Sequence, residues 1–285
     1  MLRTAYVNGR YVPGHLAMIH IEDRGYQFSD GVYEVCEVRD GCIIDERRHM
    51  ARLARSLDEL RIARPMPANS LSVVMHECLR RNRVRDGIVY LQITRGVARR
   101  DHAFPPTDTR PSVVVTARSM NFAENERIAA EGIAVITLLD NRWERVDIKS
   151  VSLLPNVLAK QRARELGAKE AWFVDKGGQV TEGSSTNAWI VSREGKVITR
   201  PADTGILRGI TRTVLIDVIA AHGLELEERS FTAEEAYRAR EAFVTSASQV
   251  VLPVVRIDDR PIGNGVPGSI ATALRAKFHC YVERS

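Results

Sequence analysis

Short β-rich segments alternate with amphipathic helical segments along most of this chain. The dipeptide formed by Asn8 and Gly9 separates two alternating stretches, AYV and RYV, and is typical of a tight β-hairpin. Asp40 and Gly41 predict a second hairpin of the same kind. Taken alone, this alternation supports a two-domain protein of the α/β or α+β class.

The first part of the chain contains two predicted helices. Between Met50 and Leu60 the apolar residues recur at spacings of three and four, which predicts an amphipathic helix over 45–62. Asp45 stands where the N-cap of that helix is expected. A second helix is predicted at 70–83.

A proline-rich and charged loop follows these helices. It lies between the β-rich segments 88–96 and 111–117, and its composition predicts exposure to solvent. Loops of this kind often carry functional residues.

The polar segment SMNFAENE is the predicted linker between two domains. We therefore expect an N-terminal domain at 1–118, a linker at 119–126 and a C-terminal domain at 127–285. The second domain is richer in β-structure. Its strands are predicted at about 133–139, 170–175, 187–192, 196–199, 225–230, 241–245 and 250–257, and its helices near 154–166, 208–222 and 268–282.

The composition is that of an ordinary globular protein. A hydrophobic share of 44% over 285 residues can bury a sizeable core without metals or disulfides. The longest apolar stretches, such as 214–221, are shorter than the roughly 20 residues that a membrane-spanning helix needs. The first residues alternate like a strand and lack the regions of a signal peptide, so we expect a cytoplasmic protein with no membrane segment.

Neither the cysteines nor the net charge of +5 predicts a special partner. The cysteines have no pair at metal-ligand spacing, so we expect buried thiols and no bound metal. The positive charge makes nucleic-acid binding an alternative function, because clustered Lys and Arg attract phosphate. The arginines lie mostly on the polar sides of helical patterns, without interleaved aromatic residues, which favours an ordinary charged surface.

Lys149 stands in a distinctive local context. It follows the apolar strand IAVITLL and the segment DNRWERVDI, and it precedes SVSLLPNVLAK, which is predicted to turn into a helix. A lysine held in a cleft at this place is a candidate for covalent chemistry with an aldehyde. The alternative is a solvated surface lysine, which is the usual position of this residue type.

Two further segments suggest a site. In GILRGITRTVL, Gly209, Ile210 and Thr211 begin a predicted helix, where free backbone N–H groups and a hydroxyl suit a phosphate. Ordinary helix capping is the alternative. In TEGSSTNAWIV, Glu182 precedes small polar residues at the mouth of a strand, and a tight turn with a solvated carboxylate is the alternative there.

Six segments, taken in order, resemble the fold-type IV pyridoxal-phosphate enzymes. They are RGYQFSDGVYEV at 24–35, HMARL at 49–53, DIKSVSLLPNVLAKQRA at 147–163, TEGSSTN at 181–187, GILRGITR at 205–212 and FVTSAS at 243–248. The resemblance covers nearly the whole chain, and six motifs in one order are far more specific than any single motif. The family includes D-amino-acid transaminases, branched-chain aminotransferases, R-selective amine transaminases and aminodeoxychorismate lyases. Within it this chain most resembles the D-amino-acid transaminases.

The resemblance implies an α+β fold, with a smaller N-terminal α/β domain and a larger C-terminal β-barrel-like domain that carries helices. It also implies pyridoxal 5'-phosphate as the cofactor. Lys149 matches the lysine that binds the cofactor aldehyde and moves a proton between the substrate Cα and the cofactor. Glu182 matches the carboxylate that pairs with the pyridine nitrogen. Arg52 matches the phosphate-binding arginine, whose planar fork suits phosphate oxygens.

The remaining cofactor contacts are also implied by the resemblance. Ile210 and Thr211 match backbone and hydroxyl donors to the phosphate, and Ser246 with Ala247 completes that site. Some relatives carry a threonine at the position of Ala247, so here a backbone N–H remains but a hydroxyl contact is lost. Leu207 matches an apolar residue that packs against the cofactor ring.

The expected substrate site depends on three residues. In D-amino-acid transaminases a tyrosine and the arginine and histidine of an R-x-H loop bind the substrate carboxylate, and Tyr33, Arg100 and His102 match them. Cationic side chains with a hydroxyl form charge-assisted hydrogen bonds to a carboxylate. In the family this loop crosses a dimer interface, which implies a homodimer with each active site at the subunit interface. The alternative is a solvated run of charges around Asp101.

The implied reaction is a ping-pong transfer of an amino group from a D-amino acid to a 2-oxo acid. D-alanine and 2-oxoglutarate are the expected pair. Three alternatives stay open: a branched-chain L-amino-acid aminotransferase, a lyase of the aminodeoxychorismate type, and a non-catalytic basic protein that binds nucleic acid. The joint presence of Lys149, Glu182 and Arg52 argues against the last of these.

Overall fold

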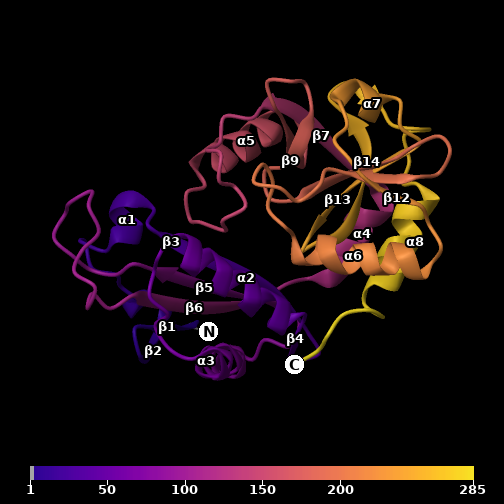
Figure 1. Ribbon diagram of the computed structural model, residues 1–285. Coiled ribbons are helices and arrows are strands. Elements are labelled where there is room, and N and C mark those ends of the chain that lie inside the picture. Colours follow the sequence, from indigo (N-terminus) through magenta and orange to yellow (C-terminus); the bar gives the residue numbers. More distant parts are fainter. Residues whose placement is uncertain (1–2) are drawn as a thin grey trace. The chain divides into compact units, whose positions relative to one another are not determined.

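The computed structural model describes residues 3–285 and divides into two compact units (Figure 1). The first unit contains 1–122, of which 3–122 are described, together with 148–152 and 283–285. The second unit contains 123–147 and 153–282. Residues 148–152 and 283–285, which the sequence placed in the C-terminal domain, thus pack with the first unit. The predicted boundaries at 1–118, 119–126 and 127–285 stay a prediction.

The first unit is built on a six-stranded sheet in the order β2-β1-β6-β5-β3-β4. Its strands are β1 (Thr4–Val7), β2 (Arg10–Pro13), β3 (Gly31–Arg39), β4 (Cys42–Ile43), β5 (Gly87–Thr94) and β6 (Ser112–Ser119). All neighbouring strands pair antiparallel. Both predicted hairpins are confirmed, since β1 pairs with β2 and β3 pairs with β4 around the expected turns.

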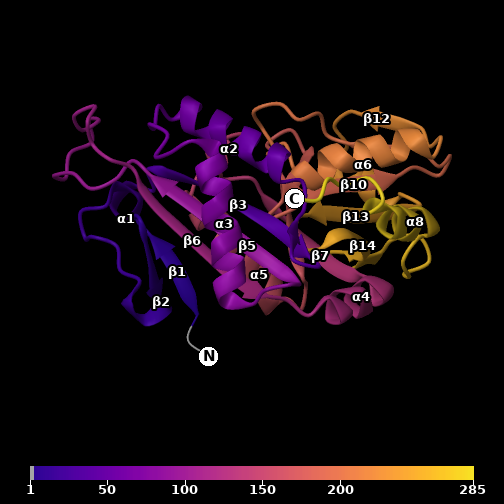
Figure 2. The same ribbon diagram turned by 90° about the horizontal axis from the view of Figure 1, so that it is seen from below.

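Two helices, α2 (Glu46–Glu59) and α3 (Ala68–Asn82), pack on one face of this sheet (Figure 2). Because side chains alternate along a strand, Cys36 of β3 and Leu91 of β5 point into the core that these helices cover. Tyr33, Tyr90 and Gln92 therefore belong to the opposite face. The two predicted helices are confirmed, but Asp45 makes no side-chain cap to α2. Its carboxylate instead accepts the backbone N–H of Glu283 at 3.1 Å, and Asp45 has a positive φ of 52°.

The start of the first unit also contains a short 3-10 helix and a short α-helix. The 3-10 helix is Gly14–Leu16, and α1 covers Arg24–Phe28. Asp23 caps α1, because its carboxylate accepts the N–H of Gly25 at 2.9 Å. Neither helix was predicted from the sequence.

The second unit is built on a strongly curled nine-stranded sheet, with the path β12-β11-β10-β13-β14-β7-β8-β9 and β15 paired to β14. Its strands are β7 (Ile133–Leu139), β8 (Glu170–Val174), β9 (Val180–Gly183), β10 (Asn187–Val191), β11 (Val197–Thr199), β12 (Leu226–Glu228), β13 (Glu241–Ser246), β14 (Val250–Ile257) and β15 (Arg260–Pro261). Its helices are α4 (Phe122–Glu131, which starts at the last residue of the first unit), α5 (Leu154–Glu165), α6 (Ile210–Ala221), α7 (Ala233–Tyr237) and α8 (Ser269–Phe278).

Alternation along the strands separates the cores of the second unit. On β10, Trp189 packs with α6 and α8, whereas Ile190 faces the opposite core with α7. On β8, Phe173 packs against α5. The helices at 154–166, 208–222 and 268–282 are confirmed, although α8 ends at Phe278. The first half of α4 falls in the predicted linker 119–126 and the second half directly after it. The elements β9, β15 and α7 were not predicted.

Candidate active site

Lys149 lies on a short segment that extends the sheet of the first unit beside β3. The N–H of Tyr33 donates to the carbonyl of Lys149 at 3.0 Å, and Val151 donates to Gly31 at 3.0 Å. The N–H of Lys149 lies 3.3 Å from the hydroxyl of Ser56 on α2. Backbone bonds on both sides of Lys149 therefore fix where its side chain begins.

The amine of Lys149 lies over the ring of Tyr33, 4.1 Å from its centroid. Tyr33 in turn stacks on Tyr90 of β5, with ring centroids 5.8 Å apart. The hydroxyl of Tyr90 donates to Gln92 at 2.7 Å, and burial, with a further contribution from Tyr33, raises the pKa of Tyr90 to about 12. Tyr33 and Lys149, predicted separately, are thus brought together on the face of the sheet opposite α2 and α3.

Arg52 of α2 is buried against Glu34 of β3. Its Nε and Nη2 donate to the two carboxylate oxygens of Glu34 at 2.8 and 2.7 Å, which is a bidentate pair. His49 contacts the same carboxylate through Nδ1 at 2.7 Å. Burial opposes the charge on Glu34, but Arg52 and His49 together hold the pKa of Glu34 well below its usual range. The guanidinium therefore has a fixed, charged partner on its sheet side.

Arg100 and His102 lie on the loop that joins β5 to β6. The guanidinium of Arg100 lies 4.8 Å from the centroid of the Phe28 ring. The centroid of the His102 ring lies 5.3 Å from the same point. Within residues 3–285, neither side chain makes a hydrogen bond or ring contact with Tyr33. A single chain therefore does not assemble the three predicted substrate residues.

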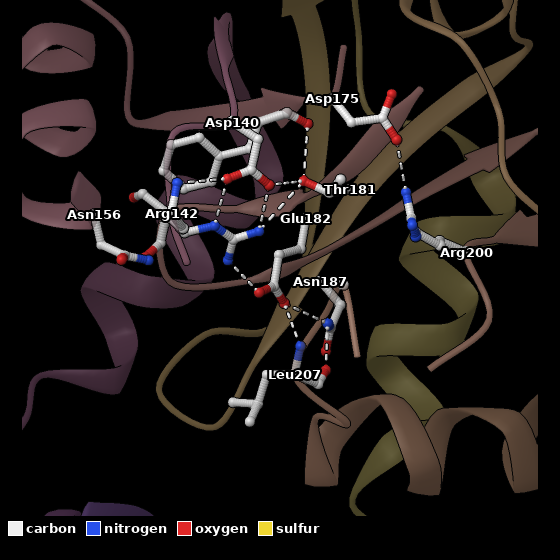
Figure 3. A network of polar contacts seen from close by, with 12 residues as sticks. Asp140, Arg142, Asn156, Asp175, Thr181, Glu182, Asn187, Arg200 and Leu207 are labelled. Carbon is white, nitrogen blue, oxygen red and sulfur yellow. Dashed lines mark hydrogen bonds and ion pairs between the residues drawn. The ribbon is translucent and has the colours of Figure 1, made fainter. Parts of the chain in front are cut away.

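Glu182, at the end of β9, is the centre of a buried polar network in the second unit (Figure 3). Arg142 donates through Nη1 to Glu182 at 2.5 Å. The same guanidinium forms a bidentate pair with Asp140, at 2.9 and 2.7 Å. Burial acts against the charge of Arg142, but Asp140 and Glu182 raise its pKa. The predicted alternative of a solvated Glu182 is thus wrong, because the residue is only 6% exposed.

Two further donors orient the other oxygen of Glu182. The side-chain amide of Asn187 donates to it at 3.1 Å, and the N–H of Leu207 does so at 3.1 Å (Figure 3). Asn187 also donates to the carbonyl of Leu207 at 2.9 Å. A Cβ at Gly209 would lie 2.2 Å from the amide oxygen of Asn187, so glycine is required for this approach. The structure thus brings Glu182 and Leu207 together.

The N-terminus of α6 lies at the same end of the sheet as this network. Ile210 and Thr211 are the first residues of α6 and are buried, and the first N–H groups of a helix have no partner within it. Asn187 pairs with Thr245 on β13, and Ser246 is the last residue of that strand. Ser246 therefore ends the strand that runs beside Asn187, and Ala247 follows it directly.

Glu170 is another buried carboxylate near Glu182, and it was not predicted from the sequence. It is 2% exposed and accepts from the hydroxyls of Ser184 and Ser185 and from the N–H of Ser184 at 3.2 Å. The amine of Lys160 on α5 lies 3.1 Å from its Oε2. Glu170 thus holds the small polar residues that follow Glu182. Its position at the start of a strand, next to apolar residues, was the only sequence signal.

The described part of the chain offers neither a metal-binding cluster nor a membrane-spanning helix. Residues 3–285 contain no cluster of three or more His, Cys, Asp or Glu side chains that would bind a metal ion. No helix within them is long and apolar enough to cross a membrane.

Comparison with known proteins identifies the family. The model of the class IV amino-transferases matches residues 31–257. A D-alanine aminotransferase of Bacillus licheniformis is 40% identical over 272 residues, which cover 94% of each chain. Another from Staphylococcus haemolyticus is 36% identical over 278 residues, which cover 98% of this chain and 97% of the relative.

Solved aminotransferase structures also match nearly the whole chain. A branched-chain amino acid aminotransferase solved with pyridoxamine 5'-phosphate has a TM-score of 0.89 and 25% identity, and the match covers 99% of this chain and 98% of that chain. The branched-chain aminotransferase of the archaeon Thermoproteus uzoniensis has a TM-score of 0.85 and 25% identity, with 100% of this chain and 99% of that chain covered.

The chain belongs to the class IV aminotransferase family and has the fold-type IV architecture predicted from its sequence. It is an aminotransferase that depends on pyridoxal phosphate and acts on amino acids and 2-oxo acids.

Proposed function

We propose that this protein is a D-amino-acid transaminase that transfers the amino group of D-alanine to 2-oxoglutarate. The observation that carries the proposal is the likeness to proteins named D-alanine aminotransferase, at 36% and 40% identity over 94% or more of this chain. The R-x-H loop with Arg100 and His102 supports the same substrate class.

The residues of the second unit fit the pyridine and phosphate ends of the cofactor. Glu182 is buried, ionically paired and oriented by three donors, which suits a carboxylate that holds a protonated ring nitrogen. Bound pyridoxal phosphate supplies the electron sink of the reaction. The first N–H groups of α6 and the buried hydroxyl of Thr211 suit a phosphate. We assign Leu207 to the ring face, and Ile210, Ser246 and Ala247 to the phosphate.

The residues of the first unit fit the reacting end of the cofactor and add one arginine at its phosphate. We assign to Lys149 the bond with the cofactor aldehyde and the carriage of the substrate Cα proton. The backbone bonds around Lys149 and its position over the ring of Tyr33 orient the amine. We assign Arg52 to the phosphate, and Glu34 would keep its guanidinium in place.

Tyr33, Arg100 and His102 are assigned to the substrate carboxylate. In one chain the last two lie against Phe28 and make no contact with Tyr33 among the described residues. This arrangement supports a homodimer in which the loop of one subunit completes the site of the other. The expected location of the protein is the cytoplasm.

A branched-chain L-amino-acid aminotransferase is the second candidate, because the matching solved structures are enzymes of that name. A half-reaction separates the two. The purified holoenzyme is mixed with D-alanine or with L-leucine, without an acceptor, and the visible absorbance of the bound cofactor is followed. Rapid loss with D-alanine alone is the expected result. Loss mainly with L-leucine would overturn the proposal. The Lys149→Ala variant is the control and should show neither change.

A further inference from the structure

We propose that Asp30 is a positioning residue, which fixes the substrate-binding loop by holding two buried arginines, Arg24 and Arg95. The inference rests on the proposed function, in which Arg100 and His102 bind the substrate carboxylate. Asp30 itself touches neither residue and acts through the arginines.

The carboxylate of Asp30 is shared between the two guanidinium groups. Its Oδ2 accepts from Nε of Arg24 at 2.8 Å and from Nε of Arg95 at 2.7 Å, and its Oδ1 accepts from Nη2 of Arg95 at 2.9 Å. The side chains of Arg24, Asp30 and Arg95 are 4%, 12% and 9% exposed. Burial opposes the charge of Asp30, but hydrogen bonds from the arginines lower its pKa, so the carboxylate stays ionised.

Arg24 connects Asp30 to the backbone around His102. Its Nη1 donates to the carbonyl of Asp101 at 2.6 Å and to that of Ala103 at 3.3 Å, the residues on either side of His102. The same guanidinium lies 4.8 Å from the ring of Phe28. Arg100 and His102 both pack against that ring. Arg24 therefore fixes both the backbone around His102 and the Phe28 ring on which the two side chains lie.

Arg95 holds the beginning of the same loop. It donates to the carbonyls of Leu60 and Arg61 at 2.7 and 2.8 Å. Its guanidinium lies 3.8 Å from the ring of Phe104, which belongs to the loop. The N–H of Arg95 also donates to the carbonyl of Asp30 at 3.0 Å. Through Arg24 and Arg95, Asp30 thus connects the backbone around His102 and the start of the loop to the end of β5.

This arrangement suits positioning better than stability alone. Arg100 and His102 are exposed and lie in a segment with no regular secondary structure, so no helix or strand sets their direction. A buried ion pair contributes little net stability, because desolvation offsets the attraction. Two guanidinium forks on one carboxylate do set direction, because their hydrogen bonds are strong and planar.

The test compares Asp30→Asn with the wild-type holoenzyme, using D-alanine and 2-oxoglutarate. Loss of the charge should raise the KM for D-alanine about 10–100-fold, the range expected for charge-assisted hydrogen bonds, with kcat little changed. The visible absorbance and affinity of the bound cofactor should not change. Asp58→Asn removes an exposed pair with Arg64 at 2.9 Å and is the matched control. If Asp30→Asn does not fold, Arg24→Lys is the second variant. It keeps the positive charge but loses the planar guanidinium, and it should also raise the KM for D-alanine with kcat little changed.

A double-mutant cycle with Arg100→Ala separates positioning from a general structural role. If Asp30 acts through the loop, the two effects on KM should not add, because Arg100→Ala already removes much of what Asp30 positions. An additive result, or an unchanged KM in both Asp30→Asn and Arg24→Lys, would overturn the inference. If Arg100→Ala itself leaves the KM unchanged, the proposed substrate site fails, and the inference fails with it. A normal KM in the Asp30 variant beside a raised KM in the Arg100 variant rejects only the inference.

Discussion

Arg142 donates to Glu182 across 40 residues of sequence, with Nη1 and Oε1 2.5 Å apart. The side chains are 4% and 8% exposed, so the pair is almost removed from water. Asp140 holds the other side of the same guanidinium. Arg142, itself fixed by Asp140, thus orients the carboxylate of Glu182 that is assigned to the cofactor ring (Figure 3).

Arg142→Gln should weaken cofactor binding. Without Arg142, Glu182 is no longer held in place for the ring nitrogen, and the dissociation constant of pyridoxal phosphate should rise by at most about 10–100-fold, the equivalent of one charge-assisted hydrogen bond of roughly 1.5–3 kcal/mol. The measurement is a titration of the apoprotein followed by absorbance. Arg127→Gln, which removes an exposed arginine of α4, is the control and should bind the cofactor normally. Equal affinity in both variants would contradict the role of Arg142.

His49 should make the stability of the fold depend on pH. Burial lowers the pKa of His49 from its usual value of about 6.5, although Glu34 acts in the opposite direction. As the pH falls below about 6.5, His49 therefore binds a proton in the unfolded chain but stays neutral in the folded chain. Stability is present above that pH and is lost below it, by up to about 1.4 kcal/mol per pH unit.

His49→Gln tests this dependence. The variant lacks the titrating ring, so its free energy of unfolding should change less between about pH 6.5 and 5 than that of the wild type. Urea unfolding at a series of pH values measures both curves. Parallel curves over this range would show that His49 does not contribute to the acid dependence.

Glu170→Gln should destabilise the second unit and loosen the residues after Glu182. The neutral amide cannot accept from both Ser184 and Ser185 as the carboxylate does, and Lys160 loses its partner. We expect a loss on the order of 3 kcal/mol in the free energy of unfolding, since hydrogen bonds to charged groups are worth roughly 1.5–3 kcal/mol each. Chemical denaturation gives the value. The exposed Glu165→Gln is the control, and an equal effect there would refute the assignment.

Phe243→Ala should test the core between the sheet and the helices of the second unit. Phe243 is fully buried and stacks on Trp189, with ring centroids 5.5 Å apart. Removing the ring leaves a cavity and should cost about 3–5 kcal/mol. Thermal unfolding measures the change. Val73→Ala, at a position that is 67% exposed, should shift stability by no more than about 0.5 kcal/mol.

Local pattern determined much of the fold. The apolar runs that became β7 and β14 were predicted with the bounds observed, because they have only 7 and 8 residues and are rich in β-branched side chains, which favours a buried strand over a helix. The helices α2 and α3 were predicted for a similar reason, since an apolar stripe needs a face to bury. The motifs around Lys149 and Glu182 also indicated the family from sequence alone.

Short elements were less predictable. The helix α1 has five residues, too few for a helical period to show, and the first half of α4 lies in the polar stretch 119–126 that was predicted as a linker. Such elements form because tertiary contacts stabilise them, not because their own sequence favours them.

The partners of the buried charges were decided by tertiary structure. Asp45 was predicted as a helix cap, yet its carboxylate accepts the N–H of Glu283, 238 residues further along. Arg142 finds Glu182, and Arg24 finds the carbonyls of the loop 77 and 79 residues away. The sequence by itself determined the residue types, the periodicity and the family. Only the folded chain decided which charges meet, because a buried ion pair depends on the distance between side chains and not on their spacing in sequence.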